Sequence, residues 1–460
     1  MNIQNYSSSL SPQKKIIAVG LALGVSLSIA YYATIAFSRP NPWKYRFQRP
    51  EVGSVTKNIQ QEIAFHQQRI QQQPAAGLER ASLASSYLKM ARATGDSSWY
   101  LLAEQTAQQS LNQLSVNNYG AILVLAKIAA AKHDFNTAKS LLKQIPPQSE
   151  SLALLTTIQL ATGDTVSAQK TADSLVQRIP TMGNYALKAL AEVARGQDQA
   201  AIQNFKAAIA SEESDEAGSS AWIRTLLGRL YYKRGQLQQA EELYQSALQI
   251  LPQYPPALLN SAELAVRKWQ SKPQETQHLQ RATEIYRQFF LTHQQAPTVY
   301  DHVALRGLAR IQRLQGETTQ SDKTWGRAVA KLRSDLNGFG HRRELAQLLM
   351  ERGQEKDLIE ALALMQAEVK TRQDPETWDT LAMAYLRMKQ LPAAEQAMQR
   401  ALKSGIRDPG IADRAAAIAS ARGDAAQDKK YQELVKSIDP LFDTGAKQAL
   451  GLGVGLSGLN

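Results

Sequence analysis

The residues that could carry out chemistry are few and are scattered along the chain. There is no cysteine, which excludes disulfides, thiolate metal sites and a cysteine nucleophile. The six histidines include no pair with the close helical spacing of a zinc site. A glycine-rich run at Gly451, Gly453 and Gly455 follows no strand and opens no clear helix, unlike a phosphate-binding loop. We therefore predict no catalytic, cofactor or metal site and no enzyme activity.

Cationic side chains are the remaining candidates, because the formal net charge is +12. An excess of lysine and arginine favours nucleic acid, anionic lipid or an acidic protein as a partner. Arg306, Arg310 and Arg313 fall at successive turns of one helix face. Their mutual repulsion costs stability unless an anion or a carboxylate lies close. Two interpretations stay open: these arginines pair with carboxylates on the next helix or face solvent, or they bind an acidic peptide segment or a C-terminal carboxylate.

A repeated pattern of small and aromatic residues predicts the elements that position these cations. In residues 228–252, Gly228 and Ala240 stand where two antiparallel helices must approach closely, and Tyr244 fills the space beside them. Gly235 lets the chain turn between the two helices. Similar offsets recur along the chain, with a small residue at the position of Gly228: Ala126, Thr156, Ala189, Ala309 and Ala382. One such helical hairpin cannot bury both of its faces, so it must stack on its copies.

The period of about 34 residues and this pattern resemble the tetratricopeptide repeat (TPR) family over roughly residues 77–440. Trp378 matches the tryptophan of the family, whereas Arg224 replaces it in the copy around Gly228. The resemblance implies an all-α fold: a right-handed superhelical TPR solenoid of about ten helical hairpins, stabilised by stacking between neighbours. It also implies a concave groove that binds protein ligands.

In the TPR arrangement, residues of the first helix of each hairpin line this groove. On this sequence, those positions are small or apolar in the first repeats, basic in the middle and mildly acidic at the end. The family's chaperone-binding members hold a carboxylate with lysine, arginine and asparagine, but an arginine stands where the asparagine is expected, so we do not predict a heat-shock chaperone as ligand. The resemblance implies a partner-binding groove that contains Arg229, Tyr232, Lys233, Arg267, Arg306, Arg310, Arg313 and Arg343.

An uncharged apolar stretch covers residues 16–37. At 1.5 Å rise per residue it extends about 33 Å, enough to cross a hydrocarbon core of about 30 Å. We predict a transmembrane helix here; the alternative is a cleaved signal peptide, whose apolar region is usually shorter. Basic residues on both flanks favour, by a narrow margin, a cytoplasmic C-terminal part. The predicted location is a single-pass protein of a bacterial-type inner membrane, or of a thylakoid membrane, whose soluble part faces the cytoplasm.

The remaining segments complete the predicted organisation. An apolar fraction of 43% with 17 prolines and 26 glycines is typical of a folded chain. An apolar stripe on residues 54–73 predicts a helix that packs on the first repeat, and the same stripe is an alternative surface for a homo-oligomer. The predicted order is an N-terminal tail at 1–15, the anchor at 16–37, a basic Pro-rich linker at 38–53, the capping helix at 54–73, TPR blocks at 77–210 and 221–440, and a Gly/Leu-rich tail at 441–460.

These features predict a membrane-anchored TPR scaffold or adaptor. It would bind a protein partner, as an acidic peptide or a helical segment, and help to assemble or regulate a membrane complex without a cofactor. With the opposite topology, the chain would instead be a periplasm-facing assembly or delivery factor for an enzyme complex. RNA binding through the basic groove is a less favoured alternative, because little aromatic stacking surface lies among the arginines.

Overall fold

The structure, a computed structural model, describes residues 41–51, 53–292, 298–339 and 341–442. The chain divides into two units, Met1–Lys44 and Tyr45–Asn460, and every helix described below belongs to the second unit. The predicted anchor at 16–37 lies outside the described residues, as does the tail at 441–460 except for its first two residues. Among the helices that the structure describes, none combines the length and the apolar character needed to cross a bilayer.

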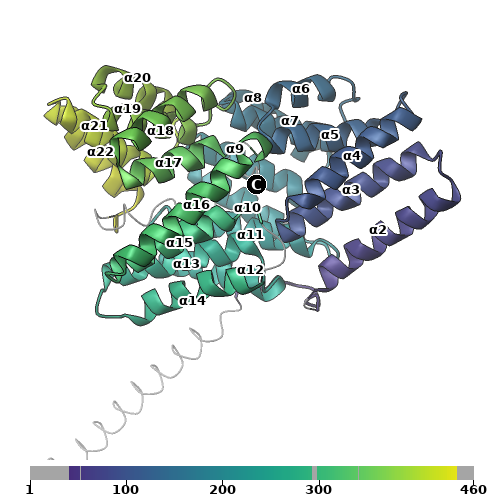
Figure 1. Ribbon diagram of the computed structural model, residues 1–460, viewed down its shortest axis with the longest axis horizontal. Helices are drawn as coiled ribbons and strands as arrows, with labels where there is room; N and C mark the ends of the chain where they lie inside the picture. The colour runs from purple at the N-terminus through teal and green to yellow at the C-terminus, as the bar shows by residue number, and fades with distance from the viewer. Residues whose placement is uncertain (1–40, 52, 293–297, 340, 443–460) are drawn as a thin grey trace, which may run out of the picture. The chain divides into compact units, whose positions relative to one another are not determined.

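The described part of the chain contains 21 α-helices and no strand. After α2, the helices pair in order as ten antiparallel hairpins, α3 with α4 through α21 with α22, and Figure 1 shows these pairs. This confirms the all-α prediction. The helices are α2 (Ser54–Gln72), α3 (Gly77–Thr94), α4 (Ser98–Gln113), α5 (Tyr119–Ala131), α6 (Phe135–Leu142), α7 (Ser149–Ala161), α8 (Thr165–Arg178), α9 (Met182–Ala194), α10 (Asp198–Ala210), α11 (Ala217–Tyr232), α12 (Leu237–Ile250), α13 (Pro255–Ser271), α14 (Gln277–Thr292), α15 (Asp301–Leu314), α16 (Thr318–Phe339), α17 (Arg342–Arg352), α18 (Glu355–Glu368), α19 (Pro375–Arg387), α20 (Leu391–Leu402), α21 (Pro409–Ala421) and α22 (Ala425–Ile438).

Local sequence signals define where many of these helices begin. The side chains of Asp134, Asp164 and Asp424 each accept a hydrogen bond from a backbone N–H in the first turn of α6, α8 and α22. Such caps satisfy donors that have no partner inside the helix. Pro375 and Pro409 open α19 and α21, where the missing N–H of proline costs nothing. Short hairpins therefore form without long connecting loops.

Close approach of helices depends on small residues, within a hairpin at Gly228 and between neighbouring hairpins at Gly307; the sequence pattern identified the first of these. A Cβ atom at Gly228 would lie 2.6 Å from Cε1 of Tyr244, and one at Gly307 would lie 2.2 Å from Cζ of Tyr286. Both tyrosines are buried against these glycines. The aromatic ring fills the space that the absent side chain leaves, so the small residue and the tyrosine together set the distance between the helices.

Arg224, which replaces the family's tryptophan, is fully buried on α11. Its guanidinium group pairs with Glu212, donates to Oγ of Ser246 at 3.1 Å and donates to the carbonyl oxygen of Ser220 at 3.1 Å. Glu212 lies between the predicted TPR blocks at 77–210 and 221–440, and α11 begins in the same interval, at Ala217. A buried guanidinium group needs a carboxylate beside it, and Glu212 supplies it for Arg224.

Hairpins that are distant in sequence also touch each other. The turn inside one hairpin contacts the loop that opens the sixth hairpin after it, and we call these the turn-to-turn contacts. The backbone N–H of Val299 donates to the carbonyl oxygen of Gly95 at 2.8 Å, and that of Gln373 donates to Ala161 at 2.8 Å. A Cβ atom at Gly163 would lie 2.6 Å from the carbonyl oxygen of Gln373. Glycine therefore permits the approach as well as the turn.

Tyr45 and Arg46, which precede α2, pack on the array. Tyr45 is buried with Ala217 and Ile250, and its hydroxyl donates to the carbonyl oxygen of Ser214 at 3.3 Å. Arg46 donates to carbonyl oxygens at the end of α10, where a cation is favoured by the helix dipole. These two residues thus contact hairpins far along the chain.

Two glycine substitutions test the helix-to-helix contact. Gly228→Ala places a methyl group against the Tyr244 ring, and we expect it to lower the free energy of unfolding by about 1–3 kcal/mol. Gly326→Ala in α16 meets no atom within 4 Å, and we expect it to be neutral or to stabilise by up to about 1 kcal/mol through helix propensity. Urea unfolding followed by circular dichroism measures both. Equal effects would contradict the role of the close approach.

Candidate partner-binding site

The residues predicted to line the groove lie on the first helices of four consecutive hairpins, or directly after one of them. They are Arg229 and Tyr232 on α11, Lys233 after it, Arg267 on α13, Arg306, Arg310 and Arg313 on α15, and Arg343 on α17. Each cation among them lies within ion-pair distance of at least one carboxylate of the same chain. The structure thus shows pairing with carboxylates, while a role of these residues in binding a partner stays a prediction.

Arg229, Tyr232 and Arg267 form one buried group. The guanidinium groups of Arg229 and Arg267 both lie over the ring of Tyr232, 5.0 Å from its centroid. Arg229 lies 2.5 Å from Glu263, and Arg267 lies 2.5 Å from Asp439. Burial opposes the charge of Arg229, but the Glu263 carboxylate raises the pKa of its guanidinium group above the ordinary value. These cations are stabilised by the chain itself.

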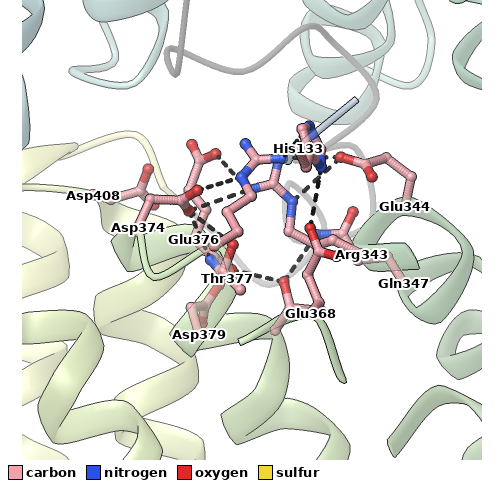
Figure 2. Close-up of polar contacts among 12 residues, drawn as sticks. His133, Arg343, Glu344, Gln347, Glu368, Asp374, Glu376, Thr377, Asp379 and Asp408 are labelled. Carbon is pink, nitrogen blue, oxygen red and sulfur yellow. Dashed lines mark hydrogen bonds and ion pairs between the residues drawn. The ribbon is translucent and has the colours of Figure 1, made fainter. Parts of the chain in front are cut away.

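Arg343 is surrounded by carboxylates, as Figure 2 shows. Its Nη1 lies 3.2 Å from Asp374 and 3.4 Å from Glu376, and its Nη2 lies 3.1 Å from Glu344. Burial opposes the charge of Arg343, yet these carboxylates raise the pKa of its guanidinium group above the ordinary value. One cation therefore faces three carboxylates, and two of these are shared with other cations: Asp374 with Arg372 and Glu376 with Lys233.

Lys233 lies next to these carboxylates. Its ammonium group pairs with Asp408 and lies 3.6 Å from Glu376. Burial alone would raise the pKa of Asp408, but Lys233 lowers it below the ordinary value. Asp379 behaves differently: burial raises the pKa of its carboxyl group even though Arg414 lies 2.6 Å away.

A histidine from the second hairpin completes the group drawn in Figure 2. His133 lies in the turn between α5 and α6, and its Nδ1 is 3.2 Å from the fully buried Glu368. Its Nε2 lies 3.4 Å from Nη1 of Arg372. Because an arginine N–H can only donate, Nε2 accepts this hydrogen bond and the ring proton lies on Nδ1. Nδ1 is within ion-pair distance of Glu368 but makes no hydrogen bond to it. His133 thus joins the turn of the second hairpin to the end of α18 and to the loop that opens α19.

Arg306 and Arg310 differ from the other predicted cations because both contact the carboxylate of Glu351. The Nε atom of each arginine lies 3.3 Å from Oε2 of Glu351, and each also pairs with Oε1. The exposed side-chain fractions are 11% for Arg306, 16% for Arg310 and 21% for Glu351. In the part of the chain that the structure covers, Nη1 of Arg310 has no hydrogen-bond acceptor.

The charges of this group influence each other. Burial lowers the pKa of Arg310, and the neighbouring Arg306 lowers it further, while Glu351 opposes both effects. Burial would raise the pKa of Glu351, but Arg306 and Arg310 lower it below the ordinary value. Two guanidinium groups share one carboxylate, and Arg306 also donates to Oε1 of Gln347 at 3.4 Å, so the three charged groups together carry a positive charge.

The third arginine of α15 lies outside this group. Arg313 pairs at 2.9 Å with Asp322, and their side chains are 54% and 62% exposed. An exposed pair of this kind contributes little to stability. The structure thus brings Arg306 and Arg310 together and separates Arg313 from them.

The arrangement offers charged hydrogen-bond donors and acceptors for binding. In the described ranges, no three histidine, aspartate or glutamate side chains are placed to hold a metal ion. The carboxylates that complete these groups, such as Glu263, Glu351 and Asp439, were not predicted from the sequence. One spacing could have identified Glu263, which follows Arg229 by 34 residues, about one repeat period.

Removal of the shared carboxylate tests the electrostatics of this group. Glu351→Gln leaves two arginines without their common counterion, so we expect the free energy of unfolding at pH 7 to fall by about 2 kcal/mol. Because the pKa of Glu351 is lowered in the folded chain, its contribution is present above the ordinary pKa and is lost as the pH falls. Urea unfolding of both proteins from pH 7 to pH 3 should therefore show the difference shrink on acidification.

Asp322→Asn is the matched control, because it removes the carboxylate of the exposed Arg313 pair. We expect a change below about 0.5 kcal/mol. A Glu351→Gln variant as stable as Asp322→Asn would show that the shared carboxylate does not stabilise the two arginines.

Comparisons with known proteins agree with the helical-repeat pattern. Residues 222–254 match the family model described as Tetratricopeptide repeat. These residues comprise most of α11 and all of α12, the hairpin in which Gly228 faces Tyr244. No curated protein matches the sequence.

Three solved structures illustrate the similarity. The human IFIT1 dimer with PPP-AAAA is 12% identical, covers 85% of this chain and 95% of its own, and has a TM-score of 0.44. An IFIT1 monomeric mutant with Gppp-AAAA is 14% identical, with coverages of 78% and 80% and a TM-score of 0.43. A tetratricopeptide repeat protein from Parabacteroides merdae is 15% identical, with coverages of 62% and 98% and a TM-score of 0.34.

The family-model match and the stacked hairpins lead to one conclusion. The chain contains a tetratricopeptide repeat at residues 222–254, and its described helices fit a TPR-type solenoid, a fold that suggests a scaffold for protein–protein interaction.

Proposed function

We propose that this protein is a membrane-anchored TPR scaffold that binds an acidic segment of another protein at Arg306 and Arg310. Binding would bring the partner to a membrane complex that the scaffold helps to assemble or regulate. The chain would act by binding alone, without a cofactor and without catalysis. The single observation that supports this site is the contact of two guanidinium groups with one partly exposed carboxylate.

The other predicted cations are less suited to an external ligand. Arg229 and Arg267 are fully buried with their own carboxylates, and Arg343 faces three of them. A partner carboxylate there would add negative charge where the chain's own carboxylates already compensate the cations. At Arg306 and Arg310 an added carboxylate would instead meet two cations that share one carboxylate. Charge balance therefore favours Arg306 and Arg310.

Glu351 gives the site a way to exchange partners. Its side chain is partly exposed, so a second carboxylate can approach from solvent and take over contacts with one arginine. Glu351 would then remain with the other arginine, and each guanidinium group would have its own counterion. Such charge-assisted bonds are stronger and more directional than neutral ones.

Binding of an acidic peptide tests the site. We expect the full-length chain to bind fluorescently labelled hexaglutamate, and Arg310→Gln to weaken this binding roughly tenfold or more, because one charge-assisted contact is lost. Fluorescence anisotropy at low and high salt measures the affinity, which should fall as salt screens the charges.

Arg281→Gln serves as the control, because Arg281 is a mostly exposed arginine on the neighbouring helix α14. It should bind hexaglutamate as the unchanged protein does, and a neutral hexaglutamine peptide should bind neither. Equal affinity of the Arg310→Gln and Arg281→Gln variants would exclude Arg310 as the site.

The membrane part of the proposal rests on the uncharged apolar stretch at residues 16–37. We expect the full-length chain to stay with membranes during alkaline carbonate extraction, because an inserted helix is not released by charge changes. Deletion of residues 1–37 should release it, and reporter fusions at the C-terminus should place the soluble part in the cytoplasm. A chain that carbonate extracts fully would rule out the anchor, and a periplasmic reporter signal would support the opposite topology.

A further inference from the structure

The last turn-to-turn contact involves the chain segment that follows the final described helix. Asp439 directly follows α22, and its carboxylate reaches α13 and the turn between α11 and α12. This is where an eleventh hairpin would begin if the register of six hairpins continued. Elsewhere the loop that opens a hairpin takes this position, and here residues 439–442 take it.

The surface that receives Asp439 is shaped for a carboxylate. Nη2 of Arg267 lies 2.5 Å from Oδ2 of Asp439, while Nη1 of Arg267 donates to the carbonyl oxygen of Tyr232 at 2.9 Å. The ring of Tyr232 lies against the same guanidinium group, which holds it in place. A Cβ atom at Gly235 would lie 2.3 Å from Oδ1 of Asp439, so only a glycine leaves room for the carboxylate. We call Arg267, Tyr232 and Gly235 the aspartate receptor.

The bound segment has a defined local conformation. The N–H of Leu441 donates to Oδ1 of Asp439 at 3.0 Å, which makes a turn closed by the aspartate side chain. The N–H of Phe442 donates to the carbonyl oxygen of Asp439 at 3.0 Å. Pro440 restricts the backbone between Asp439 and Leu441. The recognised feature is therefore an aspartate in a tight turn, followed by proline. The next residue, Leu441, is 60% exposed and lies toward solvent.

This contact can open in a way that the other turn-to-turn contacts cannot. The bond between Gln373 and Ala161 joins loops that are continuous with hairpins on both sides, so its opening requires whole hairpins to move. Residues 439–442 are held on one side only by α22, within the part of the chain that the structure describes. They can leave the receptor while the hairpins keep their stacking.

We propose that the aspartate receptor is a second binding site for protein segments, occupied in cis by residues 439–442. A partner segment with an aspartate in the same Asp-Pro turn displaces the chain's own segment. Two of the residues in the receptor, Tyr232 and Arg267, belong to the predicted groove, so the cis segment blocks part of that groove until a partner replaces it. The proposal does not depend on the site at Arg306 and Arg310.

A labelled peptide with the sequence Ser-Ile-Asp-Pro-Leu-Phe, copied from residues 437–442, tests this directly. We expect full-length Asp439→Asn, whose own segment has lost its charge, to bind the peptide at least tenfold more tightly than the unchanged chain. A peptide with asparagine in place of aspartate should not bind. Addition of Arg267→Gln to Asp439→Asn should abolish binding, whereas addition of Arg310→Gln should leave it unchanged. Fluorescence anisotropy measures all of these affinities.

Equal peptide affinity of the unchanged chain and Asp439→Asn would overturn the proposal, as would binding that survives Arg267→Gln. Because the buried Arg267 loses its counterion in Asp439→Asn, that variant could fail to fold, and a second measurement uses the unchanged protein. Excess peptide should accelerate hydrogen exchange of the Leu441 and Phe442 amides and leave the Gln373 amide unaffected. No acceleration at Leu441 and Phe442 would show that the cis segment is not displaced.

Discussion

The interior of this array depends on one electrostatic requirement: a guanidinium group removed from water needs a carboxylate beside it. Arg224 has Glu212, Arg229 has Glu263 and Arg267 has Asp439, and all these side chains are buried. Hydrophobic burial brings the helices together, but it does not by itself select which neighbours meet. The charged pairs do, because a wrong neighbour would leave a cation uncompensated. The requirement therefore links the packing of the hairpins to the distribution of charge inside the array.

Turn-to-turn contacts give the array a second level of organisation. In a repeat protein, stability usually comes from each unit and its nearest neighbours. Here the turns of early hairpins also contact the sixth hairpin after them, through backbone hydrogen bonds, glycines and ion pairs such as Asp198 with Arg407. Consecutive hairpins, by contrast, are held by hydrophobic contacts, as in the cluster whose members run from Leu305 to Ile418. The hairpin stack and the contacts between turns thus rest on different forces.

This difference gives the cations different roles. Where a carboxylate comes from a neighbouring helix, as Glu263 does for Arg229, the pair belongs to the hairpin stack. Where it comes from residues 408 or 439, the pair joins Lys233 or Arg267 to a loop far along the chain. Arg306 and Arg310 also pair with a neighbouring helix, α17, but they share one carboxylate and that carboxylate is partly exposed. Binding of a partner is proposed where the chain's own charges are least balanced or most easily exchanged.

The hairpins themselves were predictable from local residues. Gly228 with Tyr244, the aspartate caps and the prolines that open helices act over a few residues or within one hairpin, and the repeat period places the predicted cations on corresponding helices. Glu263 follows Arg229 by one repeat period, so the same pattern could have predicted this pair. The partners of Lys233 and Arg267 could not be predicted in this way, because Asp408 follows Lys233 by 175 residues and Asp439 follows Arg267 by 172 residues. Their approach depends on the rotation added at every hairpin, which no local pattern encodes. The sequence alone determined which helices form and where the cations stand on them, and only the tertiary structure decided which carboxylates meet those cations.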